Sequence, residues 1–205
     1  MCNIGILLRR ENLTYNLQTN YVDAIEECGA NAIILYESDM QKIEECDGIL
    51  LPGGDYKQRV EDFMIWYTLE HNLPIFGICQ GMQSMATFNS NIKIENIRNT
   101  RHNQQEGYIH NVKLFTSNLK NIFQKENIKV NSHHLQTVKD SKMFRIVGVS
   151  NDGLIEAVER SEHPFQIGVQ WHPEKMRDYD EDNKRLIKTF VKECKKTYYQ
   201  KNTQN

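Results

Sequence analysis

The chain has 205 residues, with 25 lysine and arginine residues against 27 aspartate and glutamate residues, so its formal net charge is −2. This balance, with 39% hydrophobic residues, allows a buried core and lacks the basic surplus of proteins that read nucleic acids. No apolar run approaches the roughly 18 residues of a membrane span, and residues 1–8 do not resemble a signal peptide, so we expect a cytoplasmic protein without nucleic-acid or membrane partners.

The first half of the chain alternates between short apolar runs, which predict buried strands, and segments whose apolar residues have helical spacing. In chain order, the predicted elements are a strand at 4–8, a helix at 20–28, strands at 32–36 and 47–51, a helix at 60–71, a strand at 74–78 and a helix at 80–88. This order is typical of an α/β fold with a mostly parallel sheet flanked by helices. In such sheets the ligand site lies at the carboxyl ends of the strands.

The second half of the chain predicts shorter strands and one closing helix. The strands are expected at 109–115, 128–131, 145–150, 154–158 and 166–170, and the helix at 184–196. Asn151-Asp152-Gly153 is a hairpin signal between two of these strands. We therefore expect one domain at 1–196, with antiparallel strands added around the sheet, and a frayed polar tail at 197–205.

The five cysteines are Cys2, Cys28, Cys46, Cys79 and Cys194, and none of them forms a Cys-x-x-Cys pair. An odd count with such wide spacing does not predict a disulfide framework or a zinc site. We therefore expect reduced thiols, no metal and no cofactor. Four of the five should be structural or incidental, because free cysteine behaves mostly as a small buried hydrophobic residue.

The segment Gly77-Ile78-Cys79-Gln80-Gly81 predicts a sharp turn from a buried strand directly into a helix. This is a cysteine version of the nucleophile elbow, in which glycines permit the sharp turn and the close approach of another backbone. The helix N-terminus favours a thiolate, so Cys79 is the candidate nucleophile. The alternative is a structural cysteine buried in a tight turn.

A histidine and a carboxylate follow a later predicted strand, in Gly168-Val169-Gln170-Trp171-His172-Pro173-Glu174. A thiol nucleophile needs a base, and the base needs an orienting partner. Residues two apart at a strand end point to the same side, so we expect Glu174 to support His172. By itself the segment is equally well explained as an exposed turn, but together with the elbow it predicts a Cys79–His172–Glu174 catalytic triad.

A further turn, Pro52-Gly53-Gly54, ends the buried strand at 47–51. A turn rich in glycine can direct backbone N–H groups into a site. We assign the Gly54 N–H, with the Gln80 N–H, to an oxyanion hole. Without the other motifs, a plain turn at the end of a strand would explain this segment better.

These three motifs together resemble the motif set of class I glutamine amidotransferase-like proteins. A fourth segment, Val130-Asn131-Ser132-His133-His134-Leu135-Gln136, is similar to the Asn-Ser-x-His-His stretch of the branch that hydrolyses γ-glutamyl amides, which includes γ-glutamyl-γ-aminobutyrate hydrolase and is of the peptidase C26 type. The resemblance covers residues 4–190. It implies the flavodoxin-like fold of class I glutaminases.

The resemblance also implies a reaction, in which a γ-glutamyl amide is hydrolysed to glutamate and an amine through a glutamyl thioester on Cys79. By the family pattern, Gln83, Ser132 and His133 bind the glutamyl group. Adjacent side chains in a strand face opposite ways, so at most one of His133 and His134 should reach the site. A metal site on this histidine pair has weak support, because no cysteine or carboxylate ligand lies at a useful spacing.

The sequence departs from this branch after Gly54 and after the helix at 80–88, where a Tyr-Gly turn and a Gly-Gly pair are usual. These segments should flank the pocket mouth, so the leaving amine stays open. One member of the wider family removes a γ-glutamyl cap from a cytidine diphosphoramidate in capsule biosynthesis, which suggests a nucleotide amidate. The loop at 98–102 would then accept a phosphate, although an ordinary surface loop explains its sequence better.

Two other functions are consistent with these motifs. A glutaminase subunit would use the same residues to supply ammonia to a separate synthase, whereas a free-standing hydrolase needs only its small-molecule substrate. A catalytically silent binding protein could share the fold, but the intact set of Cys79, His172 and Glu174 argues against it. The oligomeric state is left open, with a homodimer among the options.

Overall fold

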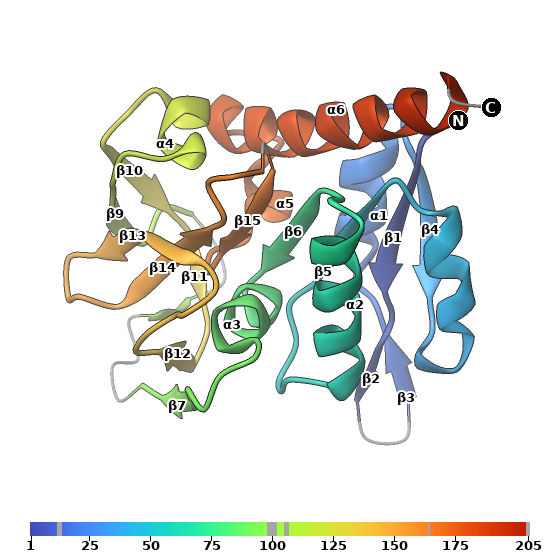
Figure 1. Ribbon diagram of the computed structural model, residues 1–205. Helices are drawn as coiled ribbons and strands as arrows, with labels where there is room; N and C mark the ends of the chain where they lie inside the picture. The colour runs from blue at the N-terminus through green and yellow to red at the C-terminus, as the bar shows by residue number, and fades with distance from the viewer. Residues whose placement is uncertain (12–13, 98–101, 105–106, 164, 204–205) are drawn as a thin grey trace.

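The structure is a computed structural model that describes residues 1–11, 14–97, 102–104, 107–163 and 165–203 (Figure 1). Within these residues, nine strands form one sheet, in the order β10 (Asn127–Val130), β9 (His110–Leu114), β13 (Arg145–Ser150), β14 (Ile155–Glu159), β15 (Gln166–Val169), β6 (Ile75–Ile78), β5 (Gly48–Leu51), β1 (Asn3–Leu7) and β4 (Asn31–Leu35). Every strand expected from the sequence is therefore present, with ends shifted by a residue or two.

The sheet has a parallel half and an antiparallel half. Strands β15, β6, β5, β1 and β4 pair in parallel, and β10, β9, β13, β14 and β15 pair in antiparallel fashion. The predicted α/β class is confirmed, and the second half adds antiparallel strands as expected. Strand β15 joins the two halves, because it pairs antiparallel with β14 and parallel with β6.

Helices cover both faces of the sheet (Figure 1). One face carries α1 (Thr19–Glu26), α4 (Asn118–Phe123), α5 (Pro173–Met176) and α6 (Glu181–Thr203), and the other carries the 3₁₀ helix η1 (Glu37–Glu45), α2 (Arg59–Glu70) and α3 (Gln80–Thr87). Each face of the sheet has its own hydrophobic core, and successive strand side chains alternate between them. Phe76 packs in the first core, under α1, α4, α5 and α6, and Ile75 packs in the second, under η1, α2 and α3. Among the described helices, none is long and apolar enough to cross a membrane.

Three small two-stranded sheets were not predicted. They pair β2 (Arg9–Glu11) with β3 (Thr14–Asn16), β7 (Ile94–Asn96) with β12 (Gln136–Val138), and β8 (Asn103–Gln104) with β11 (Ser132–His133). Their strands have only two or three residues, too few for a periodic pattern to emerge. Asn96, Asn103, His133 and Gln136 of the last two sheets line the same pocket as Cys79, and these two sheets are called the pocket wall below.

The C-terminal tail also differs from the expectation. Residues 197–203 continue α6 instead of fraying. The side chain of Tyr198 packs against the first core, and the Lys201 ammonium donates to the Cys46 carbonyl at 2.8 Å. These tertiary contacts hold a segment whose polar sequence alone predicts disorder.

Candidate active site

The predicted elbow is present between β6 and α3. Cys79 has φ +54° and ψ −107°, a region that side chains rarely occupy, and the first turn of α3 follows it at once. The flanking glycines are required by space. A Cβ at Gly77 would lie 2.6 Å from the Met85 sulfur, and one at Gly81 would collide with the Leu51 carbonyl oxygen. The local sequence thus explains why the chain can turn here and present Cys79.

Cys79 lies at the floor of a pocket and is only 6% exposed. Its Sγ is 3.9 Å from the His133 carbonyl oxygen and 3.5 Å from the Gln170 side-chain amide nitrogen, which donates toward it. The role of Gln170 was not foreseen, although it stands within the quoted His-Pro-Glu segment. Its position directly after β15, the strand paired with β6, is what brings it to the thiol.

His172 and Glu174 form the expected contact, with 2.7 Å between Nδ1 and Oε1. The geometry behind it differs from the strand-end argument, because β15 stops at Val169 and His172 caps the short helix α5, whose first turn carries Glu174. Among the described residues, His172 Nε2 has no hydrogen-bond partner. Burial opposes protonation of His172, but negative charge on the Glu174 carboxylate and the Cys79 sulfur outweighs it and raises the pKa of His172 to about 10.

The backbone of His172 is held by Asn131, another residue whose role the sequence did not show. The His172 N–H donates to Asn131 Oδ1 at 2.8 Å, and Asn131 Nδ2 donates to the His172 carbonyl at 2.9 Å. This two-point contact fixes the loop that carries the histidine. Asn131 precedes the Ser132-His133-His134 stretch, so the fourth motif supports the site partly through a backbone contact.

The turn Pro52-Gly53-Gly54 packs directly against the side chains of Cys79 and His172. A Cβ at Gly53 would lie 3.1 Å from His172 Cε1 and 3.5 Å from Cys79 Cβ, so both side chains flank this turn. The Gly53 N–H donates to the Tyr21 hydroxyl at 3.0 Å. No partner for the Gly54 N–H is found within the described residues, and the Gln80 N–H belongs to the unpaired first turn of α3. The assignment of these two N–H groups to an oxyanion hole stays a prediction.

Arg9 holds this turn by hydrogen bonds to Pro52 and by packing against Gly54. Its Nε and Nη2 donate to the Pro52 carbonyl at 3.0 and 2.7 Å, and its guanidinium forms a buried pair with Glu61, with 2.6 Å between Nη2 and Oε1. A Cβ at Gly54 would lie 2.5 Å from Arg9 Cδ, so only glycine fits there. In the sequence, Arg9 is one of two adjacent arginines and gives no sign of burial.

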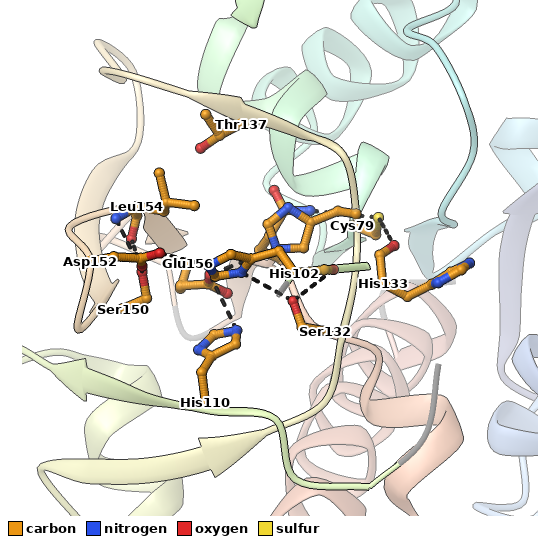
Figure 2. Close-up of polar contacts among 12 residues, drawn as sticks. Cys79, His102, His110, Ser132, His133, Thr137, Ser150, Asp152, Leu154 and Glu156 are labelled. Atoms are coloured by element: carbon orange, nitrogen blue, oxygen red, sulfur yellow. Dashed lines mark hydrogen bonds and ion pairs between the residues drawn. The ribbon is translucent and has the colours of Figure 1, made fainter. Parts of the chain in front are cut away.

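The structure separates the three residues predicted to bind the glutamyl group. Gln83 and His133 line the pocket, where Gln83 Nε2 donates to the Gln136 carbonyl and to Gln170 Oε1, both at 3.0 Å. Ser132 was wrongly predicted to face the site. It is fully buried on the opposite side of the segment, with its Oγ 3.1 Å from His102 Nδ1 (Figure 2). Adjacent side chains of β11 point to opposite sides, so the Ser132 side chain points away from the pocket and the His133 side chain points into it.

His133 faces His172 across the pocket, with 6.1 Å between the ring centroids. Burial, with the positive charges of Lys175 and His172, lowers the pKa of His133. His134 also borders the pocket, but its side chain is 2% exposed and its Nδ1 lies 2.8 Å from the Gln136 carbonyl, behind the wall. His133 is therefore the member of the pair whose ring is available to a ligand.

The pocket has a volume of about 560 Å³. Its charged lining consists of Glu11, Asp55 and Lys175 in addition to the groups already described. In the loop proposed to bind phosphate, residues 98–101 lie outside the described residues. His102 of the same loop is 2% exposed and contacts Ser132 and Asp152, so its ring is not available to a phosphate in the pocket, and the rest of the loop prediction is untested.

We expect Cys79 to be the cysteine that iodoacetamide alkylates fastest at pH 7. Burial raises the pKa of Cys2 and of Cys46 to about 12 and also raises those of Cys28 and Cys194, so these thiols stay protonated. Peptide mass spectrometry after brief labelling measures the site directly.

The matched control is Cys79→Ala, which should lose the fast phase and leave only slow labelling. Equal rates at Cys79 and at the half-buried Cys28 would contradict an activated thiol at the elbow.

Known proteins match this chain over most of its length. The peptidase C26 family model matches residues 8–174, a span that includes the elbow, the turn at 52–54 and the His172–Glu174 pair. The chain is 31% identical to the γ-glutamyl-γ-aminobutyrate hydrolase of Escherichia coli (strain K12), over 93% of this chain and 92% of that protein. It is 30% identical to a glutamine amidotransferase-like protein of Rickettsia prowazekii (strain Madrid E), over 88% and 90% of the two chains.

Solved structures share the fold at lower identity. A glutamine amidotransferase from Thermotoga maritima superposes with a TM-score of 0.64 at 18% identity, covering 96% of this chain and 85% of that one. The glutaminase domain of the Trypanosoma brucei CTPS, with bound acivicin, gives a TM-score of 0.66 at 17% identity and covers 96% and 94%. Both similarities concern the fold of the whole chain.

Proposed function

The chain belongs to the peptidase C26 family, and we propose that it is a free-standing hydrolase that cleaves γ-glutamyl amides into glutamate and an amine. The observation that carries this proposal is that Cys79 and His172 line one pocket, while the buried Glu174 carboxylate lies 2.7 Å from the His172 ring. The relative named γ-glutamyl-γ-aminobutyrate hydrolase, with coverage above nine tenths of both chains, supports the substrate class.

The reaction that we propose begins when the Cys79 thiolate attacks the γ-glutamyl carbonyl carbon. The oxyanion that forms accepts hydrogen bonds from the Gly54 and Gln80 N–H groups. His172, as imidazolium, gives its proton to the departing amine, and the C–N bond breaks to leave a glutamyl thioester. His172 then takes a proton from water, which attacks the thioester and releases glutamate and the thiolate. Glu174 accepts from Nδ1, so it holds the ring with Nε2 directed at the reaction.

We further propose that Gln83 and His133 bind the glutamyl α-amino and α-carboxylate groups. Gln83 Oε1 is buried without a hydrogen-bond partner among the described residues, so it can accept from an ammonium. His133 Nδ1 is likewise buried and unpartnered within the described part of the chain. Each of these atoms would gain a partner from the substrate, which favours a ligand with one donor group and one acceptor group.

The leaving amine is larger than ammonia in this proposal, because the pocket volume of about 560 Å³ lies in the range that accommodates ligands of drug size. A nucleotide amidate is the specific form that we propose to test. Among the described residues that line the pocket, Lys175 is the lysine or arginine side chain that could bind a diphosphate.

We expect the purified protein, without any partner, to release glutamate from γ-glutamyl amides faster than from glutamine. The assay compares glutamine, γ-glutamyl-γ-aminobutyrate and a γ-glutamyl nucleotide phosphoramidate by coupled detection of glutamate. Cys28→Ala is the matched control, because Cys28 lies in the α1 region, away from the pocket, and this variant should keep wild-type rates.

The outcomes separate the alternatives. Fast release from the phosphoramidate alone would support the nucleotide amidate, and fast release from simple amides alone would exclude it. Release from glutamine alone, or from nothing until a synthase is added, would favour the glutaminase subunit. No release from any substrate under all conditions would favour a binding protein on this fold.

A further inference from the structure

Three imidazoles and one carboxylate meet behind the pocket wall, outside the proposed triad (Figure 2). Glu156 Oε1 lies 3.8 Å from His102 Nδ1, 3.5 Å from His110 Nε2 and 3.8 Å from His134 Nε2. One ligand atom from each of the four residues falls within 4.8 Å of every other. The residues come from four separate segments: the loop before β8, the start of β9, the residue after β11, and β14.

The cluster is buried and its inner atoms are unsatisfied. The Glu156 side chain is 0% exposed, and those of His102, His134 and His110 are 3%, 2% and 15% exposed. Among the described residues, neither oxygen of Glu156 has a hydrogen-bond partner, and neither does Nε2 of His110 or of His134. A buried carboxylate without hydrogen bonds is costly, so this arrangement calls for a ligand at its centre.

The outer nitrogen of each imidazole faces an acceptor. His102 Nε2 lies 3.0 Å from the Asp152 carboxylate, His134 Nδ1 lies 2.8 Å from the Gln136 carbonyl, and His110 Nδ1 lies 3.3 Å from the Asn111 carbonyl. These acceptors can only receive a proton, so in each neutral ring the proton sits on the outer nitrogen. The inner nitrogens then present three lone pairs to one carboxylate.

One contact competes with this arrangement. The Ser132 hydroxyl lies 3.1 Å from the inner nitrogen of His102, but it also donates to the His102 carbonyl at 3.0 Å. In the second orientation it leaves the Nδ1 lone pair free. Three lone pairs that face one carboxylate repel one another unless a proton or a cation lies between them, and four ligand atoms around one centre suit a cation.

We propose that His102, His110, His134 and Glu156 form a binding site for a divalent transition metal, with Zn²⁺ as the ion that fits best. A tetrahedral Zn²⁺ with bonds of about 2.0–2.2 Å separates its ligands by about 3.3–3.6 Å, close to the 3.5–3.8 Å between Glu156 and the three histidines, and the other separations lie within 4.8 Å. In such sites each histidine ligand usually donates its other ring N–H to a carboxylate or a backbone carbonyl, as the outer nitrogens do here. Four protein ligands leave no open position, so the ion is structural and takes no part in the hydrolysis.

The ion would hold the pocket wall in place. His134 is a ligand, while its neighbour His133 supplies the carbonyl near Cys79 Sγ and the ring that faces His172. The Glu156 carbonyl accepts from the N–H of Gln170, whose side chain reaches the same thiol. Binding of the ion would therefore hold the pocket wall, through His134, and the segment that carries Gln170, through Glu156, in a fixed position relative to each other. The earlier expectation of no metal site rested on sequence spacing, which did not show Glu156 beside the histidines.

The test measures metal binding by the full chain carrying Cys79→Ala, which removes the pocket thiolate as a competing ligand. The protein is stripped with a chelator and titrated with Zn²⁺ or Co²⁺. We expect one equivalent to bind, and the Co²⁺ form to show the visible absorption of a tetrahedral ion without a thiolate charge-transfer band. Binding of less than about 0.2 equivalents of either ion, or a thiolate band, would overturn the proposal, and neither readout depends on hydrolase activity.

Variants in the same background locate the ion. His110→Ala, which removes the most exposed ligand, and Glu156→Gln should each weaken Zn²⁺ binding by roughly 100-fold or more, above the losses typical of outer-shell changes. The matched control is His163→Gln, because His163 is a buried histidine that contacts the Asn72 carbonyl outside the cluster. Unchanged Zn²⁺ affinity in both ligand variants would place the ion elsewhere and refute the site, and the titration of Cys79→Ala decides the question if a ligand variant does not fold.

Discussion

Cys79→Ala is expected to lower the rate of γ-glutamyl amide hydrolysis by roughly 10⁴-fold or more, because loss of the nucleophile removes the covalent route. The fold should survive, since the side chain is small and lines a pocket. The measurement is glutamate release under single-turnover conditions, with the circular dichroism spectrum as a check of folding. A loss below about tenfold would show that the thiol is not the nucleophile.

A second variant at this position separates chemistry from backbone strain. Cys79 has a positive φ of 54°. This backbone conformation raises the free energy of the folded state about equally for alanine and cysteine, whereas glycine adopts it without strain. Cys79→Gly should be as inactive as Cys79→Ala, yet more stable than it by about 1 kcal/mol, because strain of this kind costs of order 1–3 kcal/mol. Chemical denaturation measures the difference. Equal stability of the two variants would mean that the elbow stores no strain.

Glu61→Ala is expected to destabilise the fold by about 3–5 kcal/mol, because it leaves the Arg9 guanidinium as an uncompensated buried charge. The side chains of Arg9 and Glu61 are 2% and 0% exposed, and Glu61 also accepts from the Gln58 N–H at 2.7 Å at the start of α2. For a chain of this length the melting temperature should fall by roughly 10 °C. Thermal and urea unfolding both measure the effect.

The control is Lys139→Gln, which breaks an exposed ion pair with Glu95 and should change stability by less than about 1 kcal/mol. The double variant Arg9→Met/Glu61→Leu removes both charges together and should recover most of the lost stability. It should not recover activity, because the Pro52 carbonyl loses its two donors and the Gly54 N–H loses its support. Full activity in the double variant would show that Arg9 serves stability alone.

The sequence by itself determined the features that depend on local chain geometry. Alternating apolar runs predicted the strands, because burial on both faces of a parallel sheet needs continuous hydrophobic residues. Glycines around Cys79 predicted a sharp strand-to-helix turn, and the short interval between His172 and Glu174 predicted their contact, which one turn of α5 produces at 2.7 Å. The catalytic roles of these residues stay predictions until the assays are made.

Other features were decided only by the tertiary structure, because they are contacts between distant segments, and no sequence pattern shows which distant segments will meet. Strand β15 lies beside β6, and this pairing alone brings Gln170 to Cys79. The β8–β11 pairing turns Ser132 away from the pocket, against the family expectation.

Burial of charge was likewise invisible in the sequence. Arg9 lies next to Arg10 in the chain, yet it is buried because Glu61 and the Pro52 carbonyl, which come from distant segments, replace its hydration. Glu156 belongs to β14, whose five residues are all buried, and three histidines from three other segments surround it. Which groups surround a buried charge, a matched partner for Arg9 and three imidazoles for Glu156, is decided by the completed fold and not by the local sequence.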